Sequence, residues 1–142
     1  MAYQNILVPV DGSETSFAAV AKAAELAKAF GSKITVVQVL TLDPYIAAEY
    51  ITANQTNDLI ERARASIVKT LEEAKQKFTE QGVEAETKLL EGQVIAREIT
   101  NAAKDLNADL IVIGSHGRTG LKKLFLGSVA QSILSEGTTP VL

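Results

Sequence analysis

Short apolar runs alternate along the chain with longer segments whose apolar residues recur at helical spacing. The runs are rich in β-branched residues and bounded by glycine, aspartate or proline, a pattern typical of strands. In run 34–40 apolar residues stand at both the odd and the even positions, so they would face both sides of a strand. We therefore expect this strand to be buried on both faces, as in a parallel sheet. The predicted strands are 5–10, 34–40, 85–90, 109–113 and the beginning of a fifth at 138–142.

The segments between these runs predict four helices. They extend from the turn at 11–13 to a stop at Gly31, from Leu59 to Phe78 with Gly82 past the end, from Val94 to Leu106, and from Ser128 to a stop at Gly137. Segment 41–57 has no clear apolar period. We expect a loop there, either with a short helix that lies over a binding site or along a partner, or as an ordinary surface loop.

Strands and helices alternate, and the connections are too long for hairpins. This order predicts an α/β fold in which helices cover both faces of a parallel sheet, giving three layers. We expect residues 1–142 to form one domain. Ligands of such sheets bind beyond the carboxyl ends of the strands, where the strand order reverses. Pro9 cannot donate a ladder hydrogen bond, so we expect it near the carboxyl end of its strand.

Composition and charge narrow the classes of function. The chain is 46% hydrophobic and 22% charged, as in globular proteins. A formal charge of −3 and a pI near 5.2 argue against nucleic-acid binding. The absence of cysteine excludes disulfides, thiol catalysis and cysteine-ligated metals. No apolar run approaches the ~20 residues of a membrane span and no signal-peptide pattern opens the chain, so we expect a cytoplasmic protein without membrane insertion.

The strongest chemical signal is the glycine-rich segment 114–128, which joins the fourth strand to the last helix. Glycine lets the backbone turn at positive φ and approach a ligand closely. A helix start offers unpaired N–H groups and the positive end of its dipole, which suits phosphate. Arg118, Lys122 and Lys123 add positive charge to the loop. The segment therefore predicts a site for a small anionic ligand.

Ser128 allows two interpretations that do not exclude each other. With Gln131 three residues on, it fits a helix capping box. Its hydroxyl and N–H could also contact a phosphate, and the upstream glycines favour this, because a plain strand-to-helix connection needs no such array. The P-loop pattern is absent, and His116 stands where the dinucleotide-binding fingerprint needs its second glycine.

The spacing of this segment distinguishes it from those motifs: Gly114, two residues, Gly117, nine residues, Gly127 and Ser128. It resembles the ATP-binding signature of the universal stress protein family, of which the intervening Ser-His-Gly-Arg-Thr-Gly is also typical. The resemblance covers essentially the whole chain and implies a five-stranded sheet of order 3-2-1-4-5, with a Rossmann-like nucleotide-binding fold. The switch point then lies between strands one and four, which places Asp11 beside Gly114.

From the residues alone, Asp11 before Gly12 is either a turn former or helix cap, or a carboxylate that accepts hydrogen bonds from a nucleoside. Gly92 either closes a pocket or only turns the chain. The resemblance implies the nucleoside role for Asp11, adenine contact by the backbone of Val39, and ribose and phosphate contacts by the glycine-rich loop. The implied nucleotide-binding residues are Pro9, Val10, Asp11, Val39, Gly114, Gly117, Arg118, Gly127, Ser128 and Val129.

The implied ligand is ATP, with ADP or AMP as alternatives. Any Mg²⁺ would be held mainly by the phosphates of the nucleotide. His116 is the only histidine, and without a cysteine or carboxylate cluster it does not match a metal site, so we expect it to be a solvent-exposed loop residue. No residue is a clear catalytic base.

Three functions are therefore compatible with the sequence. The first is a stress or regulatory protein whose bound ATP sets conformation or partner choice. The second is a weak ATPase or phosphotransferase, and the third a non-catalytic dimeric scaffold or accessory subunit, against which the intact glycine array argues. The resemblance also implies a homodimer, commonly formed through the last strand; the end at Leu142 shortens that pairing edge relative to the usual family ending.

Overall fold

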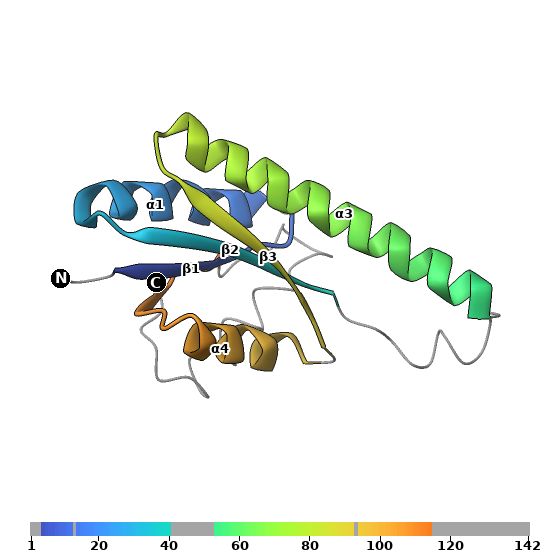
Figure 1. Cartoon of the computed structure of the whole chain (residues 1–142). Helices are drawn as coiled ribbons and strands as arrows, with labels where there is room; N and C mark the ends of the chain where they lie inside the picture. Colours follow the sequence, from blue (N-terminus) through green and yellow to red (C-terminus); the bar gives the residue numbers. More distant parts are fainter. Residues whose placement is uncertain (1–3, 13, 41–52, 93, 115–142) are drawn as a thin grey trace.

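The computed structural model of the chain describes residues 4–12, 14–40, 53–92 and 94–114, without the side chains of 14, 15 and 53–59. Strands and helices alternate as the apolar pattern predicts (Figure 1). The elements are β1 (Asn5–Pro9), α1 (Glu14–Phe30), β2 (Lys33–Leu40), α3 (Ala53–Glu80), β3 (Ala85–Glu91), α4 (Ile95–Asp105) and β4 (Leu110–Ile111).

The described strands form one parallel sheet of order β3-β2-β1-β4. This confirms the α/β fold, the parallel pairing and the reversal of strand order between β1 and β4. β4 is shorter than predicted, although the Val112 N–H still donates to the Leu7 carbonyl at 2.9 Å. Pro9 is the last residue of β1, as expected from its missing N–H. The fifth strand, predicted at 138–142, lies outside the described residues.

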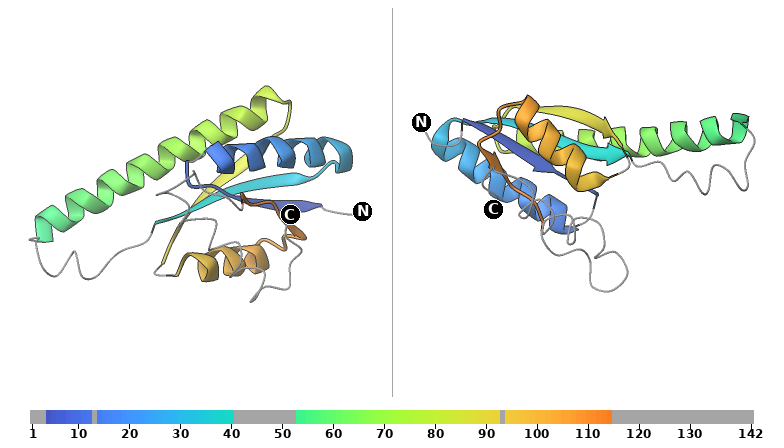
Figure 2. Two further views of the ribbon diagram at one scale, coloured as in Figure 1. Left: turned by 180° about the vertical axis from the view of Figure 1, so that it is seen from behind. Right: turned by 90° about the horizontal axis from the view of Figure 1, so that it is seen from below.

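β1 and β2 lie in the interior of the described sheet because both are apolar on both faces. Ile6 and Val8 belong to a buried cluster with residues of α1 and α3, whereas Leu7 belongs to a second cluster with residues of α4. Figures 1 and 2 show the corresponding layers, with α1 and α3 on one face of the sheet and α4 on the other. In β2, Val36 and Val37 divide between the same two clusters. The predicted burial of this strand on both faces is therefore confirmed.

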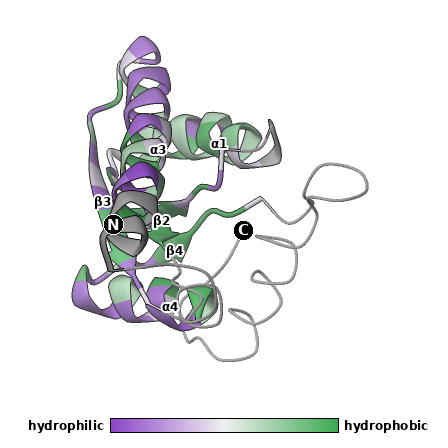
Figure 3. Ribbon diagram, turned by 90° about the vertical axis from the view of Figure 1, so that its right-hand side faces the viewer, coloured by the Kyte–Doolittle hydropathy of each residue, from purple (hydrophilic) through white to green (hydrophobic). Residues whose placement is uncertain are grey.

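The helices end where the sequence predicts. Gly31 and Gly82 follow α1 and α3 at φ of 66° and 78°, values that glycine adopts without strain. Figure 3 shows mostly apolar residues on β2 and β4 and many polar residues on β3, α3 and α4. No helix in the described part of the chain is both long and apolar enough to cross a membrane.

α3 begins earlier than expected. Residues 53–57 belong to the helix, although the sequence pattern places them in the segment 41–57 that has no clear apolar period. With 28 residues the helix is about 42 Å long at 1.5 Å per residue, whereas the seven residues of β3 span about 23 Å. Its first turns extend past the end of the sheet (Figure 1). A helical segment with no sheet beneath it needs no apolar stripe, so periodicity could not detect it.

Val94 was predicted to lie within the third helix but is its N-cap. Its backbone is extended, with φ −117° and ψ 108°, and its carbonyl accepts the Glu98 N–H at 3.1 Å. The side chain is 48% exposed, because a residue at the N-cap does not share the buried face of the helix.

Asp109 fixes the start of β1 against the start of β4. Its carboxylate accepts the backbone N–H of Gln4 at 2.8 Å and that of Asn5 at 3.0 Å. The Asp109 N–H donates in turn to the Asn5 carbonyl at 2.9 Å, and the Asn5 side chain donates to the Asn107 carbonyl at 3.2 Å. These hydrogen bonds hold segments about a hundred residues apart in sequence in one register. They are made by polar side chains, which a pattern of apolar residues cannot reveal.

We expect Asp109→Ala to lower the free energy of unfolding by about 1–3 kcal/mol, because two backbone donors lose a charged acceptor. Urea denaturation measures this change. Asp105→Ala, at an exposed position of α4, is the matched control and should stay within about 0.5 kcal/mol of wild type. Equal effects of the two substitutions would contradict the role assigned to the Asp109 carboxylate.

Candidate functional site

The candidate site lies at the carboxyl edge of the sheet, where β1, β2 and β4 end close together. The β1–β2 register pairs Pro9 with Val37, and its continuation brings Asp11 level with Val39. The β1–β4 register pairs Leu7 with Ile111, and its continuation brings Gly114 level with Val10. A hydrogen bond of 2.9 Å from the Val10 N–H to the Val37 carbonyl shows that the ladder extends past the last residue of β1.

The backbone of Val39 faces the β1 side of β2. Successive residues of a strand direct their N–H and C=O groups to alternate sides. The Val37 carbonyl accepts from Val10 on the β1 side, and the Leu40 carbonyl accepts from Gly92 at 3.1 Å on the β3 side. Val39 lies two residues after Val37, so its backbone N–H and C=O also point toward β1. They lie just past the hydrogen bond between Val10 and Val37. A donor and an acceptor on one backbone residue match the edge of a planar base.

Asp11 and Gly12 turn the chain away from β1 at this edge. Gly12 has φ +84°, a conformation that costs most other residues about 1–2 kcal/mol. A Cβ there would meet the Thr70 Oγ1 at 3.5 Å, an ordinary contact, so conformation rather than crowding requires glycine. Asp11 itself is partly buried at the end of β1.

Of the glycine-rich loop, the structure describes only its first residue. Gly114 is buried and follows Val112 and Ile113, which are 2% and 6% exposed. The loop therefore begins at the edge of the sheet where Asp11 and Val39 lie. The other predicted loop residues lie outside the described residues, and their roles stay predictions: Gly117, Arg118, Gly127, Ser128 and Val129, together with His116, Lys122 and Lys123.

The turn after β3 lies at the same edge and is held from both faces of the sheet. On the α3 side, the Arg64 guanidinium forms an ion pair with the Glu91 carboxylate at 2.8 Å. On the α4 side, the Glu98 side chain lies against Gly92, so that a Cβ at Gly92 would collide with its carboxyl group. Glu98 is in the first turn of α4, where the helix dipole favours a negative charge. The sequence pattern indicates a turn at Gly92 but gives no sign of Arg64 or Glu98 beside it.

Gln38 is a second feature of the edge that the sequence analysis missed. Its side-chain Oε1 is buried and has no hydrogen-bond partner among the residues that the structure describes. By alternation, the side chain lies on the face of β2 covered by α1 and α3, opposite to that of Val39. Gln38 is the one amide side chain inside the run 34–40, and this was the available signal.

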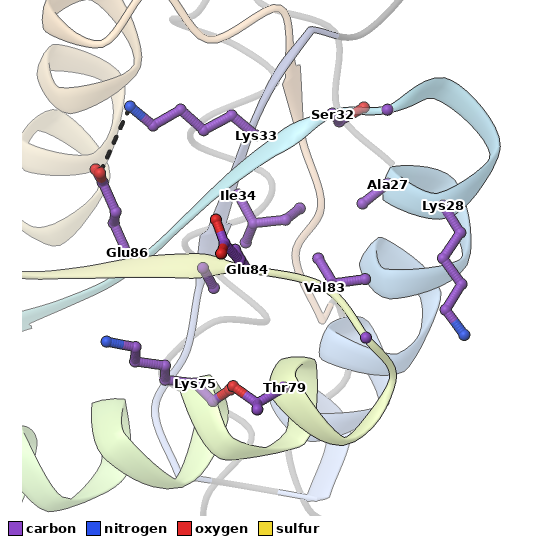
Figure 4. Close-up of a pocket in the computed structure, with 13 residues that line it drawn as sticks. Ala27, Lys28, Ser32, Lys33, Ile34, Lys75, Thr79, Val83, Glu84 and Glu86 are labelled. Atoms are coloured by element: carbon purple, nitrogen blue, oxygen red, sulfur yellow. Dashed lines mark hydrogen bonds and ion pairs between the residues drawn. The ribbon is translucent and has the colours of Figure 1, made fainter.

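A separate groove of about 690 Å³ lies at the opposite, amino edge of the sheet. Figure 4 shows its rim of charged side chains, with an ion pair of 3.6 Å between Lys33 and Glu86. The groove adjoins the ends of α1 and α3, and Lys28, in the last turn of α1, complements the negative end of that helix dipole. Ligands of parallel sheets bind at the other edge, so the groove is not the predicted site. Within the described ranges, no three His, Asp or Glu side chains cluster in a way that could hold a metal ion.

Comparison with protein families and curated proteins agrees with the motif. The model of the universal stress protein family matches residues 2–142. The chain is 36% identical to universal stress protein MJ0531 of Methanocaldococcus jannaschii over 141 residues, covering 99% of this chain and 81% of that protein. It is 34% identical to universal stress protein YxiE of Bacillus subtilis over 145 residues, covering 99% and 97%.

Solved structures share the fold. A universal stress protein family member from Burkholderia pseudomallei superimposes with a TM-score of 0.79 at 30% identity, covering 99% of this chain and 94% of that one. A universal stress protein in complex with cAMP gives 0.74 at 26% identity, covering 100% and 97%. The universal stress protein of Archaeoglobus fulgidus in complex with dAMP gives 0.66 at 26% identity, covering 100% and 98%.

The contact of Gly92 with Glu98 predicts coupling in a double-mutant cycle. Gly92→Ala alone should change the free energy of unfolding by less than about 0.5 kcal/mol, because the gain from alanine is offset by turning away the Glu98 carboxyl group, the far end of a flexible side chain. On a Glu98→Ala background the same change should stabilise by about 0.4–1 kcal/mol, since Gly92 is not at positive φ and alanine restricts the unfolded chain. Urea denaturation of the four proteins measures the coupling. Additive effects would contradict the contact.

Proposed function

The chain belongs to the universal stress protein family, and on that basis we propose that it binds an adenine nucleotide at the carboxyl edge of its sheet. The nucleotide is ATP, with ADP and AMP as competing ligands of the same site. The protein acts as a nucleotide-dependent regulatory protein of the cytoplasm, in which occupancy of the site sets conformation or the choice of partner. We further propose a homodimer as its basic assembly.

The observation that carries the proposal is the meeting of three strand ends at the switch point of the sheet. β1 brings Asp11, β2 brings the backbone of Val39, and β4 brings Gly114 to neighbouring levels of one edge. These groups come from segments far apart in sequence, and each can serve a different part of a nucleotide. Parallel sheets bind their ligands at such a position.

The ligands of the structural neighbours support an adenine nucleotide rather than another small anion. One neighbour was solved with cAMP and another with dAMP. These two molecules differ at the sugar and in the linkage of the phosphate, but both carry adenine and one phosphate group. A site for this class therefore needs a surface for the base edge and donors for the phosphate.

The residues of this chain divide between those tasks. The N–H and C=O of Val39 pair with the base edge, and the Asp11 carboxylate accepts hydrogen bonds from the nucleoside, while Pro9 and Val10 line the end of β1. The phosphates are held by N–H groups of the loop and the start of the last helix, with charge from Arg118. The loop residues in this role are Gly114, Gly117, Gly127, Ser128 and Val129. Mg²⁺ is carried by the phosphates.

Asp11→Asn separates the two interpretations of Asp11. Asparagine forms turns as readily as aspartate, so a turn former would tolerate the change. A nucleoside ligand loses a charged acceptor, and we expect the dissociation constant for ATP-Mg²⁺ to rise by about tenfold, equivalent to about 1.4 kcal/mol. Isothermal titration calorimetry on nucleotide-free protein measures binding, and urea denaturation should show unchanged stability.

Gly117→Val tests the loop from the phosphate side. A valine at a glycine of close approach should abolish binding of ATP and ADP, while the core, which lies elsewhere, remains folded. Asp105→Ala on α4 is the control and should bind as wild type does. Release of nucleotide from denatured wild-type protein, identified by chromatography, gives the native ligand. Wild-type protein that neither carries nor binds a nucleotide would overturn the proposal, and steady phosphate release that Gly117→Val abolishes would favour the weak ATPase instead.

A further inference from the structure

β3 presents an unusual edge. Among the described strands it pairs with β2 alone, and its other side forms the outer edge of the described sheet (Figure 3). The Gly92 N–H donates to the Leu40 carbonyl, so the even-numbered residues of β3 direct their backbone groups toward β2. The odd-numbered residues therefore direct theirs outward. Ala85, Thr87 and Leu89 offer a ladder of donors and acceptors to a further strand.

We propose that this edge pairs with the same edge of a second copy of the chain, antiparallel, about a two-fold axis through Thr87. In that register Thr87 faces its own copy, and Ala85 faces Leu89 of the partner in both directions. All of these are outward-directed residues, as the hydrogen-bonded pairs of an antiparallel ladder require. Glu86 faces Lys88 of the partner, also twice. This proposal does not depend on nucleotide binding.

The charges of β3 select this register. Axes through Glu86 or Lys88 would set a like charge against itself, and an axis through Ala85 would set Glu84 against Glu86. An axis through Leu89 sets Lys88 against the apolar Leu90. Within Ala85–Leu89, only the axis through Thr87 brings unlike charges together without a like-charged pair.

The side chains concerned are free to act in such an interface. Glu86 and Lys88 are exposed, on the same face of β3. Within the described residues Glu86 forms one ion pair, with Lys33 at 3.6 Å, and both side chains are more than 60% exposed. Such an exposed pair contributes little, so turning Glu86 to a partner costs little. On the other face Leu89 is partly buried against the core, and pairing would cover it further.

Charged residues on an edge strand commonly prevent pairing with other strands. Here Glu86, Thr87 and Lys88 favour one register, in which unlike charges face each other, over the others. This selectivity favours pairing of the edge with a second copy of itself. The pairing is isologous, so it closes as a dimer at this edge. It would be additional to any dimer formed through the last strand.

The absence of cysteine makes cross-linking a clean test. A Thr87→Cys variant places two thiols at a hydrogen-bonded pair with Cα atoms about 5.5 Å apart, within the range that a disulfide spans. Under mild oxidation we expect a covalent dimer to form at least about tenfold faster than for Lys69→Cys, an exposed position of α3 that controls for random collision. Non-reducing electrophoresis of the full chain reads this out. Equal rates for the two variants would overturn the proposal.

Charge reversal tests the register. Glu86→Lys and Lys88→Glu each set like charges opposite one another, and each should raise the dissociation constant of the Thr87-centred dimer about tenfold or more. The double variant restores both pairs and should return to within about threefold of wild type. Sedimentation velocity over a concentration series measures the constants, and a dimer formed through the last strand would not respond to these changes. Single variants that associate like wild type, or a double variant weaker than either single one, would contradict the register.

Discussion

The position of β1 between β2 and β4 is the constraint on which the rest of the described structure depends. Ile6 and Val8 point to one buried cluster and Leu7 to the other, so a slip of one residue would exchange the two sets. The Asp109 carboxylate holds the start of the strand at Gln4 and Asn5, and Pro9 ends it. The strand therefore has one register and one length.

That register decides where the chemistry lies. Because β1 is fixed against both neighbours, Asp11, two residues past its end, is level with Val39, and Val10 is level with Gly114. The alternation of β2 directs the backbone of Val39 to the β1 side. The turn after β3 is held at the same edge by the ion pair of Arg64 with Glu91 and by the hydrogen bond of Gly92 to Leu40, and the Glu98 side chain lies against it from the other helix layer. A binding edge built from strand ends in this way is positioned by the core rather than by its own loops.

The two lateral sides of the described sheet have different physical characters. At β4 the chain is apolar and buried, with Leu110 and Ile111 4% and 1% exposed. At β3 the outward groups are flanked by Glu86 and Lys88, exposed charges that tolerate water and discriminate between registers. The amino edge differs again, because the helix ends gather lysines there and the groove between them has a mixed-charge rim.

The sequence by itself determined the succession of strands and helices, the burial of β2 on both faces, the stops at Gly31 and Gly82, and the family, because these depend on local period, glycine conformation and a spaced motif. It misplaced the start of α3 and the role of Val94, since an overhanging helix needs no apolar stripe and an N-cap residue leaves the buried face. Only the tertiary structure decided the hydrogen bonds of the Asp109 carboxylate to Gln4 and Asn5, the contact of Glu98 with Gly92, the burial of the Gln38 oxygen and the direction of the Val39 backbone. Each of these depends on segments that are distant in sequence and meet only through the register of the sheet, which no local pattern encodes.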